Sequence, residues 1–134
     1  MPHLVILYTD NLESQTDMSG LCRKLADALL QVRDEHGQAV CPPGGVRVFA
    51  YPASHFAVAD GKRDYGFIYL NLRIARGRSA AAKQSLGEAL FSTAKAHLGA
   101  LFEARHTGMT LQIDEGQPVF DAKHGTIHPL FAGG

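Results

Sequence analysis

The chain of 134 residues carries 13 Lys and Arg against 13 Asp and Glu, so its formal net charge is zero. Hydrophobic residues make up 46% and charged residues 19%, which favours one folded globular domain over a disordered chain. A neutral chain lacks the basic excess of a general nucleic-acid binder, so nucleic acid is not expected as a partner. No apolar stretch approaches the about 18 residues that span a bilayer, and no segment resembles a signal peptide. The sequence therefore predicts a cytoplasmic protein without a membrane partner.

The first half of the chain is predicted to form a βαβ unit. Residues 4–8 are apolar at successive positions, as in a strand that is covered on both faces. Ser14 offers an N-cap with the acidic Asp17 three positions on, apolar residues follow at helical spacing, and this amphipathic helix should end by Gly37. After a connector rich in Pro and Gly at residues 41–45, residues 46–51 have the composition of a strand.

The same order of elements recurs in the second half. Residues 66–74 are predicted to form a strand, and Ser79 is predicted to cap a long helix that runs through Phe102. Gly108 should end that helix. Residues 109–114 alternate apolar and polar side chains, as a half-buried strand does. The second half is therefore also predicted to be a βαβ unit.

An offset of 65 residues superposes the two halves, which indicates an internal duplication. It places Val5 on Leu70, Leu7 on Leu72, Ser14 on Ser79, Leu21 on Leu86, Leu25 on Leu90, and residues 46–48 on 111–113. Two right-handed crossover units that share one sheet put both helices on one face. We therefore predict an α+β fold in which two fused βαβ repeats form a four-stranded mixed sheet with two helices on one face.

All 134 residues are assigned to one domain. Repeat one covers about residues 1–60, repeat two about residues 61–116, and a C-terminal packing segment residues 117–134. That segment is apolar and too short to be an independent element, and the second face of the sheet also needs cover. Both features predict a homo-oligomer. The two cysteines, Cys22 and Cys41, are too few for a disulfide framework and are predicted to be free thiols.

The first two residues, Met1 and Pro2, offer a candidate base. If Met1 is removed, as a small second residue usually permits, Pro2 becomes a secondary amine at the start of a strand. An α-amino group has a reference pKa of about 7.7–8.0, close to operating pH, whereas that of lysine is about 10.4. Taken alone, the dipeptide has a second interpretation, because proline is an ordinary first residue of a strand.

Five motifs occur in the order and at the spacing of a known family. They are Met1-Pro2-His3, Gly45-Val46-Arg47, the segment Ala-Asp-Gly-Lys-Arg-Asp-Tyr at residues 59–65, Gly77-Arg78-Ser79, and His128-Pro129-Leu130-Phe131. Together they span nearly the whole chain, which resembles the 5-carboxymethyl-2-hydroxymuconate isomerase family of the tautomerase superfamily. The resemblance implies a tautomerase-like double βαβ fold, a trimer, a role in the breakdown of aromatic compounds, and catalysis by an amino-terminal proline without metal or organic cofactor.

Carried over residue by residue, the resemblance places the catalytic base on Pro2 and two substrate-binding arginines on Arg47 and Arg78. The 65-residue offset pairs these positions with Phe67, Gln112 and Glu13, respectively. One site per chain is therefore expected, and whether a neighbouring subunit completes it stays open. Without the resemblance, Arg47 is equally well a solvent-facing strand residue and Arg78 a charge on a turn.

Two aromatic residues, Phe56 and Tyr69, are candidates for the pocket wall, although core or interface positions explain them equally well. Phe56 stands where a tryptophan is expected from the family, and the connector at residues 34–45 is longer than expected. Both departures bear on the shape of the substrate. His3 could orient a substrate, but it is not included in the catalytic set.

The implied reaction moves a proton within a small carboxylate substrate, an unsaturated 2-hydroxy or 2-oxo acid. Pro2 would remove the 2-hydroxyl proton, and arginine would bind carboxylate in a bidentate way and stabilise the dienolate. The alternatives are a non-catalytic trimer that binds a small carboxylate and a relative that uses Pro2 for a different reaction. His124 and His128 are four residues apart, but Gly125 and Pro129 disfavour the helix that would align them, so no metal site is predicted.

Overall fold

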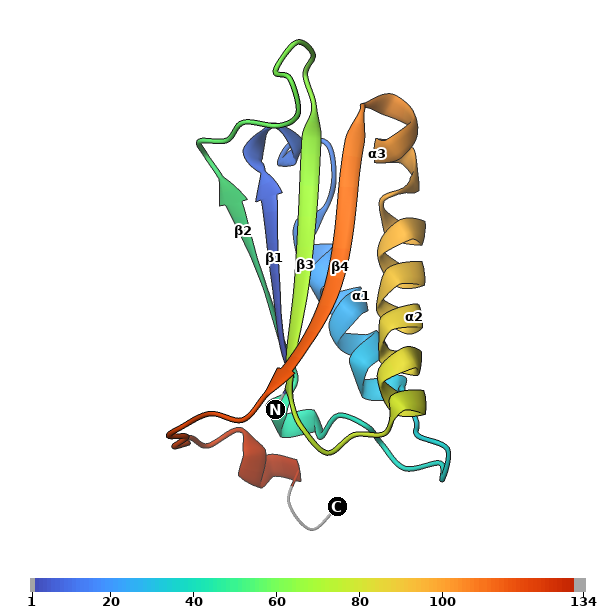
Figure 1. Cartoon of the computed structure of the whole chain (residues 1–134), viewed down its shortest axis with the longest axis vertical. Helices are drawn as coiled ribbons and strands as arrows, with labels where there is room; N and C mark the ends of the chain where they lie inside the picture. Colours follow the sequence, from blue (N-terminus) through green and yellow to red (C-terminus); the bar gives the residue numbers. More distant parts are fainter. Residues whose placement is uncertain (1, 132–134) are drawn as a thin grey trace.

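Two pairs of parallel strands lie side by side in one sheet (Figure 1). The computed structural model describes residues 2–131. In the order β2-β1-β3-β4, the outer pairs are parallel and the central pair β1 and β3 is antiparallel. The strands are β1 (His3–Thr9), β2 (Arg47–Ala53), β3 (Gly66–Ala75) and β4 (Thr107–Gly116).

The helices α1 (Met18–Gln31) and α2 (Ala80–His97) lie on one face of the sheet (Figure 1). The short helices are α3 (Gly99–Ala104) and the 3-10 turns η1 (Asp10–Leu12), η2 (Pro43–Gly45) and η3 (His128–Phe131). The predicted mixed sheet of two βαβ units with helices on one face is confirmed. No helix among the described residues is long and apolar enough to cross a membrane.

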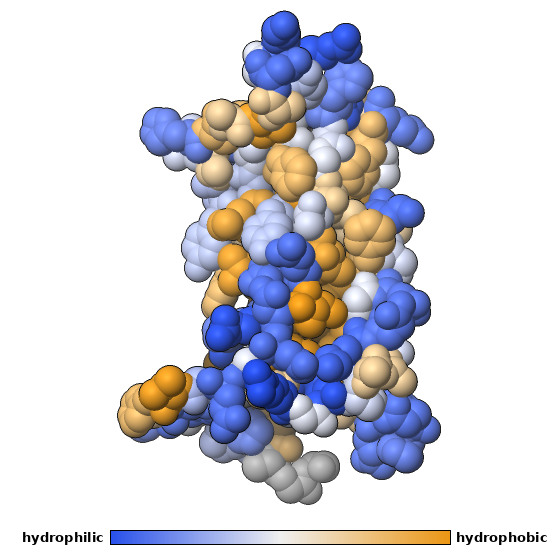
Figure 2. Space-filling view, viewed as in Figure 1, coloured by the Kyte–Doolittle hydropathy of each residue, from blue (hydrophilic) through white to orange (hydrophobic). Residues whose placement is uncertain are grey.

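The core lies between the helices and every second residue of the strands. Leu4, Ile6 and Tyr8 of β1 point to the helices and are buried, and so are four alternate residues of β3. Those four are Ile68, Leu70, Leu72 and Ile74. The residues between them point to the other side of the sheet, which we call the open face. Its exposed apolar side chains include Leu7, Phe49 and Tyr51, and apolar surface is scattered over this face in Figure 2.

The predicted 65-residue offset is wrong for the first strands. Leu7 lies on the open face and is 45% exposed, whereas Leu72, which the offset equates with it, is fully buried against the helices. Val5 and Leu70 differ in the same way. Because strand side chains alternate between faces, only an even offset such as 64 matches β1 to β3. The unbroken apolar run at residues 4–8 conceals this alternation. In the helices the offset of 65 does hold, since Leu21, Leu25, Leu86 and Leu90 are all fully buried.

The boundaries of the helices confirm one prediction and correct two. Ser79 caps α2 as predicted, because its hydroxyl oxygen accepts from Ala82 N at 3.1 Å. The cap of α1 is Asp17, whose carboxylate accepts from Gly20 N at 2.9 Å, and Ser14 lies in the preceding turn. The single long helix predicted as far as residue 102 is interrupted at Leu98, where ψ is 7°. The buried Leu98 side chain keeps both segments on one core, which is why the hydrophobic spacing continues across the break.

The C-terminal arm, residues 117–131, leaves the sheet at the end where the chain starts (Figure 1). Its last turn, η3, lies against η2 so closely that a Cβ on Gly44 would come within 2.7 Å of His128 Cα. By contrast, Val119 and Phe120 are 107% and 84% exposed, and an apolar projection stands at the lower left of Figure 2, where Figure 1 shows the arm in the same view. Packing of this arm against a neighbouring subunit stays a prediction. Cys22 and Cys41 are free thiols, as expected.

Candidate active site

Three basic side chains stand in a row on the open face where β1 begins. His3 pairs in register with Arg47 of β2 on one side and with Arg73 of β3 on the other. Residues paired across neighbouring strands point to the same face, so we call Arg47, His3 and Arg73 the basic row. Pro2, which is buried, immediately precedes this row. Its nitrogen therefore lies within about 5 Å of the His3 Cα.

Arg47 is held in place from two directions. Its Nη1 donates to the carbonyl of Gly45 at 3.1 Å, and its Nε lies 3.1 Å from His3 Nδ1. Its Nη2 is 2.7 Å from His3 Nε2. Burial lowers the pKa of His3, and the charges of Arg47 and Arg73 lower that pKa further. A neutral imidazole therefore separates two guanidinium groups and accepts from one of them.

A cavity of about 240 Å³ lies beside the basic row, and the C-terminal arm forms part of its wall. The arm contributes Lys123 and Asp121, which form an ion pair with each other. The complete lining comprises His3, Arg47, Arg73, Ile74, Ala75, Gly116, Pro118, Asp121 and Lys123. This end of the molecule is strongly hydrophilic in Figure 2. An anionic ligand would meet an excess of positive charge here.

Arg78 lies on the other side of the sheet, in the turn between β3 and α2. Its Nε donates to the carbonyl of Val40 at 3.2 Å and its Nη1 to that of Ala75 at 3.3 Å. Burial raises the pKa of the nearby Cys41 thiol, and the positive charge of Arg78 acts in the opposite direction. Arg78 lines a separate cavity of about 260 Å³ together with Glu35, whose carboxylate accepts from Ser79 Oγ at 2.9 Å.

The cavities of Arg47 and Arg78 share no lining residue. Arg47 lies on the open face beside His3, and Arg78 lies on the helix side in the turn that follows β3. Pro2 follows the alternation of β1 and belongs to the helix side with Leu4, but its nitrogen is at the end of the strand. The structure therefore brings the three predicted residues to one end of the sheet, with one arginine on each side.

The two predicted wall residues, Phe56 and Tyr69, line one apolar cavity of about 420 Å³ at the opposite end of the sheet. Leu7 and Phe67 line it with them. Tyr69 is four residues from Arg73 along β3, which corresponds to about 13 Å. Within one chain, these aromatic residues are therefore not placed at Pro2. Their separation depends on strand register, which sequence spacing alone does not reveal.

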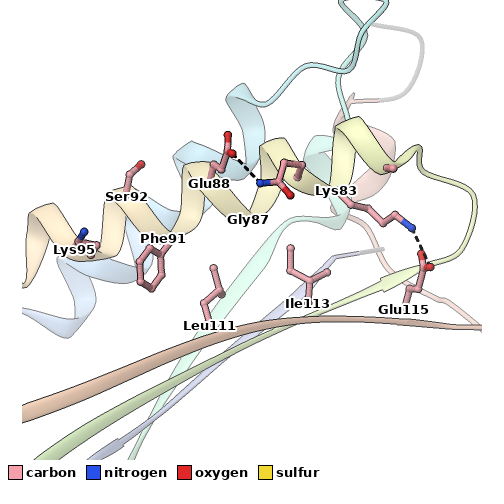
Figure 3. Close-up of a pocket in the computed structure, with 11 residues that line it drawn as sticks. Lys83, Gly87, Glu88, Phe91, Ser92, Lys95, Leu111, Ile113 and Glu115 are labelled. Carbon is pink, nitrogen blue, oxygen red and sulfur yellow. Dashed lines mark hydrogen bonds and ion pairs between the residues drawn. The ribbon is translucent and has the colours of Figure 1, made fainter.

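A cavity of about 960 Å³, larger than the three described above, lies between α2 and the edge strand β4 (Figure 3). Phe91 of α2 and Leu111 and Ile113 of β4 form its apolar floor. Its rim is polar, with Lys83 Nζ 3.1 Å from Glu115 and Gln84 donating to Glu88 at 2.8 Å. None of the predicted site residues lines this groove, and Lys83, Glu88 and Glu115 on its rim have polar partners. We therefore place the candidate site at the start of β1.

Arg73 and Lys123 are the residues of this site that the sequence interpretation missed. Tyr69, Asn71 and Arg73 are every second residue of the predicted strand. This spacing indicates that Arg73 shares their face, which points away from the core. Only the pairing of β1 with β3 places it beside His3. Within residues 2–131, no group of three or more His, Cys, Asp or Glu side chains is arranged to hold a metal ion.

Comparison with known proteins agrees with this architecture. A family model described as 5-carboxymethyl-2-hydroxymuconate isomerase matches residues 2–131, nearly the full chain. The chain belongs to the 5-carboxymethyl-2-hydroxymuconate isomerase family. The 5-carboxymethyl-2-hydroxymuconate Delta-isomerase of Escherichia coli is 31% identical over 131 residues, which cover 98% of this chain and 99% of that protein.

Solved structures support the family in three dimensions. The crystal structure of a 5-carboxymethyl-2-hydroxymuconate delta-isomerase superposes with a TM-score of 0.96 at 52% identity, covering 100% of this chain and 95% of the other. A fused 4-OT solved as an asymmetric trimer is 18% identical with a TM-score of 0.55, covering 97% and 98% of the two chains, and shows the shared fold alone. The family resemblance stated from the motifs is confirmed, and the protein is an isomerase of the tautomerase superfamily.

Proposed function

We propose that the protein isomerises 5-carboxymethyl-2-hydroxymuconate, with Pro2 as general base once Met1 has been removed. The observation that supports this proposal is that Pro2 precedes β1 at the end of the sheet where Arg47 lies on the open face and the turn that carries Arg78 follows β3. Relatives named for this substrate cover nearly the whole chain. The substrate class is one formed by cleavage of aromatic rings.

The proposed reaction converts the dienol form of the substrate into a conjugated ketone. The Pro2 nitrogen takes the proton of the 2-hydroxyl group. The electron pair of the broken O–H bond then forms the second carbon–oxygen bond of the carbonyl group. A proton is added at a distant carbon of the diene, so substrate and product have the same composition. Arg47 and Arg78 remain charged throughout and bind carboxylate, and a guanidinium near the 2-oxygen stabilises the charge that develops there.

We also propose a trimer that acts in the cytoplasm on a small carboxylate without a cofactor. The fused 4-OT relative is an asymmetric trimer, and the exposed Leu7, Phe49 and Tyr51 of the open face favour burial in an assembly. The cavity of Phe56 and Tyr69 is too far from Pro2 to serve the same chain. In a trimer, a neighbouring subunit would supply this apolar wall. We further propose that the first repeat of the domain ends near residue 60 and the second near residue 116.

The decisive experiment compares wild type with Pro2→Ala. Mass spectrometry of the purified wild type should show the loss of Met1. The base role requires this loss, because a Pro2 nitrogen acylated by Met1 is an amide without a basic lone pair. Ultraviolet absorbance then follows conversion of 5-carboxymethyl-2-hydroxymuconate. Pro2→Ala keeps an α-amine but loses the ring that orients it, so we expect a loss in kcat of at most the about 10²- to 10⁴-fold that a positioned general base contributes.

Pro52→Ala is the matched control, since Pro52 is an exposed proline of β2 outside the site, and it should retain the wild-type rate. Equal rates for wild type and Pro2→Ala would contradict a need for the proline ring, and full activity of a protein that retains Met1 would contradict the role of the Pro2 nitrogen as base. Binding of the substrate without turnover would favour a carboxylate-binding protein instead.

A further inference from the structure

We propose that Arg73 binds a second carboxylate of the substrate and makes the enzyme selective for acids that carry more than one carboxylate. This inference rests on the proposed function, since it concerns the substrate of the same site. Arg47 would hold one carboxylate on the open face, and Arg73 would hold another on the far side of His3.

The geometry of the basic row suits two carboxylates. Arg47, His3 and Arg73 come from three adjacent strands, and neighbouring strands lie about 4.8 Å apart. The two arginines are therefore about 10 Å apart at their Cα atoms, with their side chains on one face. The second guanidinium lies beside Gly116, where a Cβ would make an ordinary contact at 3.5 Å from Arg73 Nη2.

The positive charge of the row has no acidic partner in the described part of the chain. None of the ion pairs among residues 2–131 includes Arg47 or Arg73. Asp114 pairs with Arg73 in register, but its carboxylate accepts from Asn71 Nδ2 at 2.8 Å. The carboxylate of Asp121 is bound to Lys123. Two guanidinium groups thus line one cavity of about 240 Å³ in a chain whose net charge is zero.

His3 separates the two positive charges of the row without adding a third. Because its pKa is lowered, the imidazole is neutral at physiological pH and adds no charge between the two arginines. A guanidinium matches one carboxylate with its planar fork, and the contacts of Arg47 to His3 and Gly45 leave one N–H group on each of its two Nη atoms. 5-Carboxymethyl-2-hydroxymuconate carries three carboxylates by its chemical structure, so it has one for each arginine of the row and a third for Arg78.

The test measures KM and kcat of wild type and Arg73→Gln on two substrates. One is 5-carboxymethyl-2-hydroxymuconate, and the other is enolised phenylpyruvate, which has a single carboxylate. We expect Arg73→Gln to raise KM for the first about 10- to 100-fold, the range for loss of a charged hydrogen-bonding partner, with little change in kcat. KM for phenylpyruvate should stay within about twofold. Arg73→Lys keeps the charge without the planar fork and should restore only part of the affinity.

Arg76→Gln is the matched control, because Arg76 is an exposed arginine three residues further along in the turn, and it should change neither substrate. An equal effect of Arg73→Gln on both substrates, or none on either, would overturn this inference while leaving the isomerase proposal intact. Failure of the wild type on both substrates would overturn the proposed function instead.

Calorimetric binding of two unreactive acids provides a readout independent of turnover. Glutarate has two carboxylates and butyrate has one. Arg73→Gln should weaken glutarate binding at least about tenfold and leave butyrate binding unchanged. Equal binding of glutarate by wild type and a folded Arg73→Gln protein, as judged by circular dichroism, would contradict the role of Arg73.

Discussion

The two βαβ halves share one architecture but differ in how tightly the helix covers its strand. On the side of α1 that faces β2, Met18 and Ala26 are buried and Cys22 is half-buried. The residues 65 positions later are Lys83, Phe91 and Gly87, and all three line the groove between α2 and β4 (Figure 3). The duplicated framework thus tolerates an open groove in one half where the other half has packed side chains, provided that the central leucines of the helices are retained.

The halves also contribute differently to the candidate site. The first half supplies Pro2, His3 and Arg47, whereas the second supplies Arg73 and Arg78. The strands of the second half have ten residues each against seven in the first, and the end of β3 passes the start of β1. Arg73 lies within the part of β3 that pairs with β1, and the residues after it lead to the turn that carries Arg78. The active end of the sheet therefore depends on both halves, although only one of them carries the proposed base.

The largest effect is expected from matched core truncations, Leu25→Ala in α1 and Leu90→Ala in α2. Both leucines are fully buried, so each variant should lose about 2 to 5 kcal/mol of unfolding free energy through lost burial and a cavity. Urea denaturation measures the two values, which we expect to agree within about 1 kcal/mol. A much smaller cost for Leu90→Ala would mean that the loose packing of the groove extends into the core.

A smaller and opposite effect is expected from Gly87→Ala in the groove. A Cβ at this position would lie 3.5 Å from Ile113 Cδ1, an ordinary contact, and alanine favours a helix interior by about 0.8 to 1 kcal/mol over glycine. Thermal and urea unfolding should show a gain of that size. Gly20→Ala in α1 is the contrasting control, because its Cβ would come within 2.4 Å of the capping Asp17 carboxylate. It should show no net gain, and equal gains in both helices would contradict this difference between the halves.

The smallest effect concerns the connector of the first half, where Asp34 closes a turn that the second half lacks. The backbone N–H of Gln38 is the main cause that lowers the pKa of Asp34 below 3.8, and the N–H of His36 adds to it. The carboxylate therefore stabilises the fold above pH 3.8, and this contribution is lost as the pH falls through the lowered pKa.

Asp34→Asn should consequently be less stable than wild type at neutral pH, with the difference shrinking in acid. Thermal unfolding of both proteins across this pH range measures it. A difference that stayed constant with pH would show that the charge of Asp34 is not what matters. Asp60→Asn, in the loop between β2 and β3, probes a similar carboxylate outside the connector.

Much of the fold was predictable because local chemistry dictates it. The apolar spacing of both helices, the Ser79 cap and the alternation in β4 are signals within a few residues of each other. The face of Val5 and Leu7 was predicted wrongly because both faces of β1 carry apolar side chains. The break at Leu98 was missed because the buried leucine continues the helical pattern through it.

The sequence by itself determined the two βαβ units, the family, and the candidate residues Pro2, Arg47 and Arg78. Only the tertiary structure decided which residues lie together at the end of the sheet. It placed Arg73 beside His3, put Arg78 on the opposite side from Arg47, and moved Phe56 and Tyr69 to the far end. The physical reason is strand register, because it joins residues that are about 40 to 70 positions apart and a shift of one residue would reverse the face of every side chain.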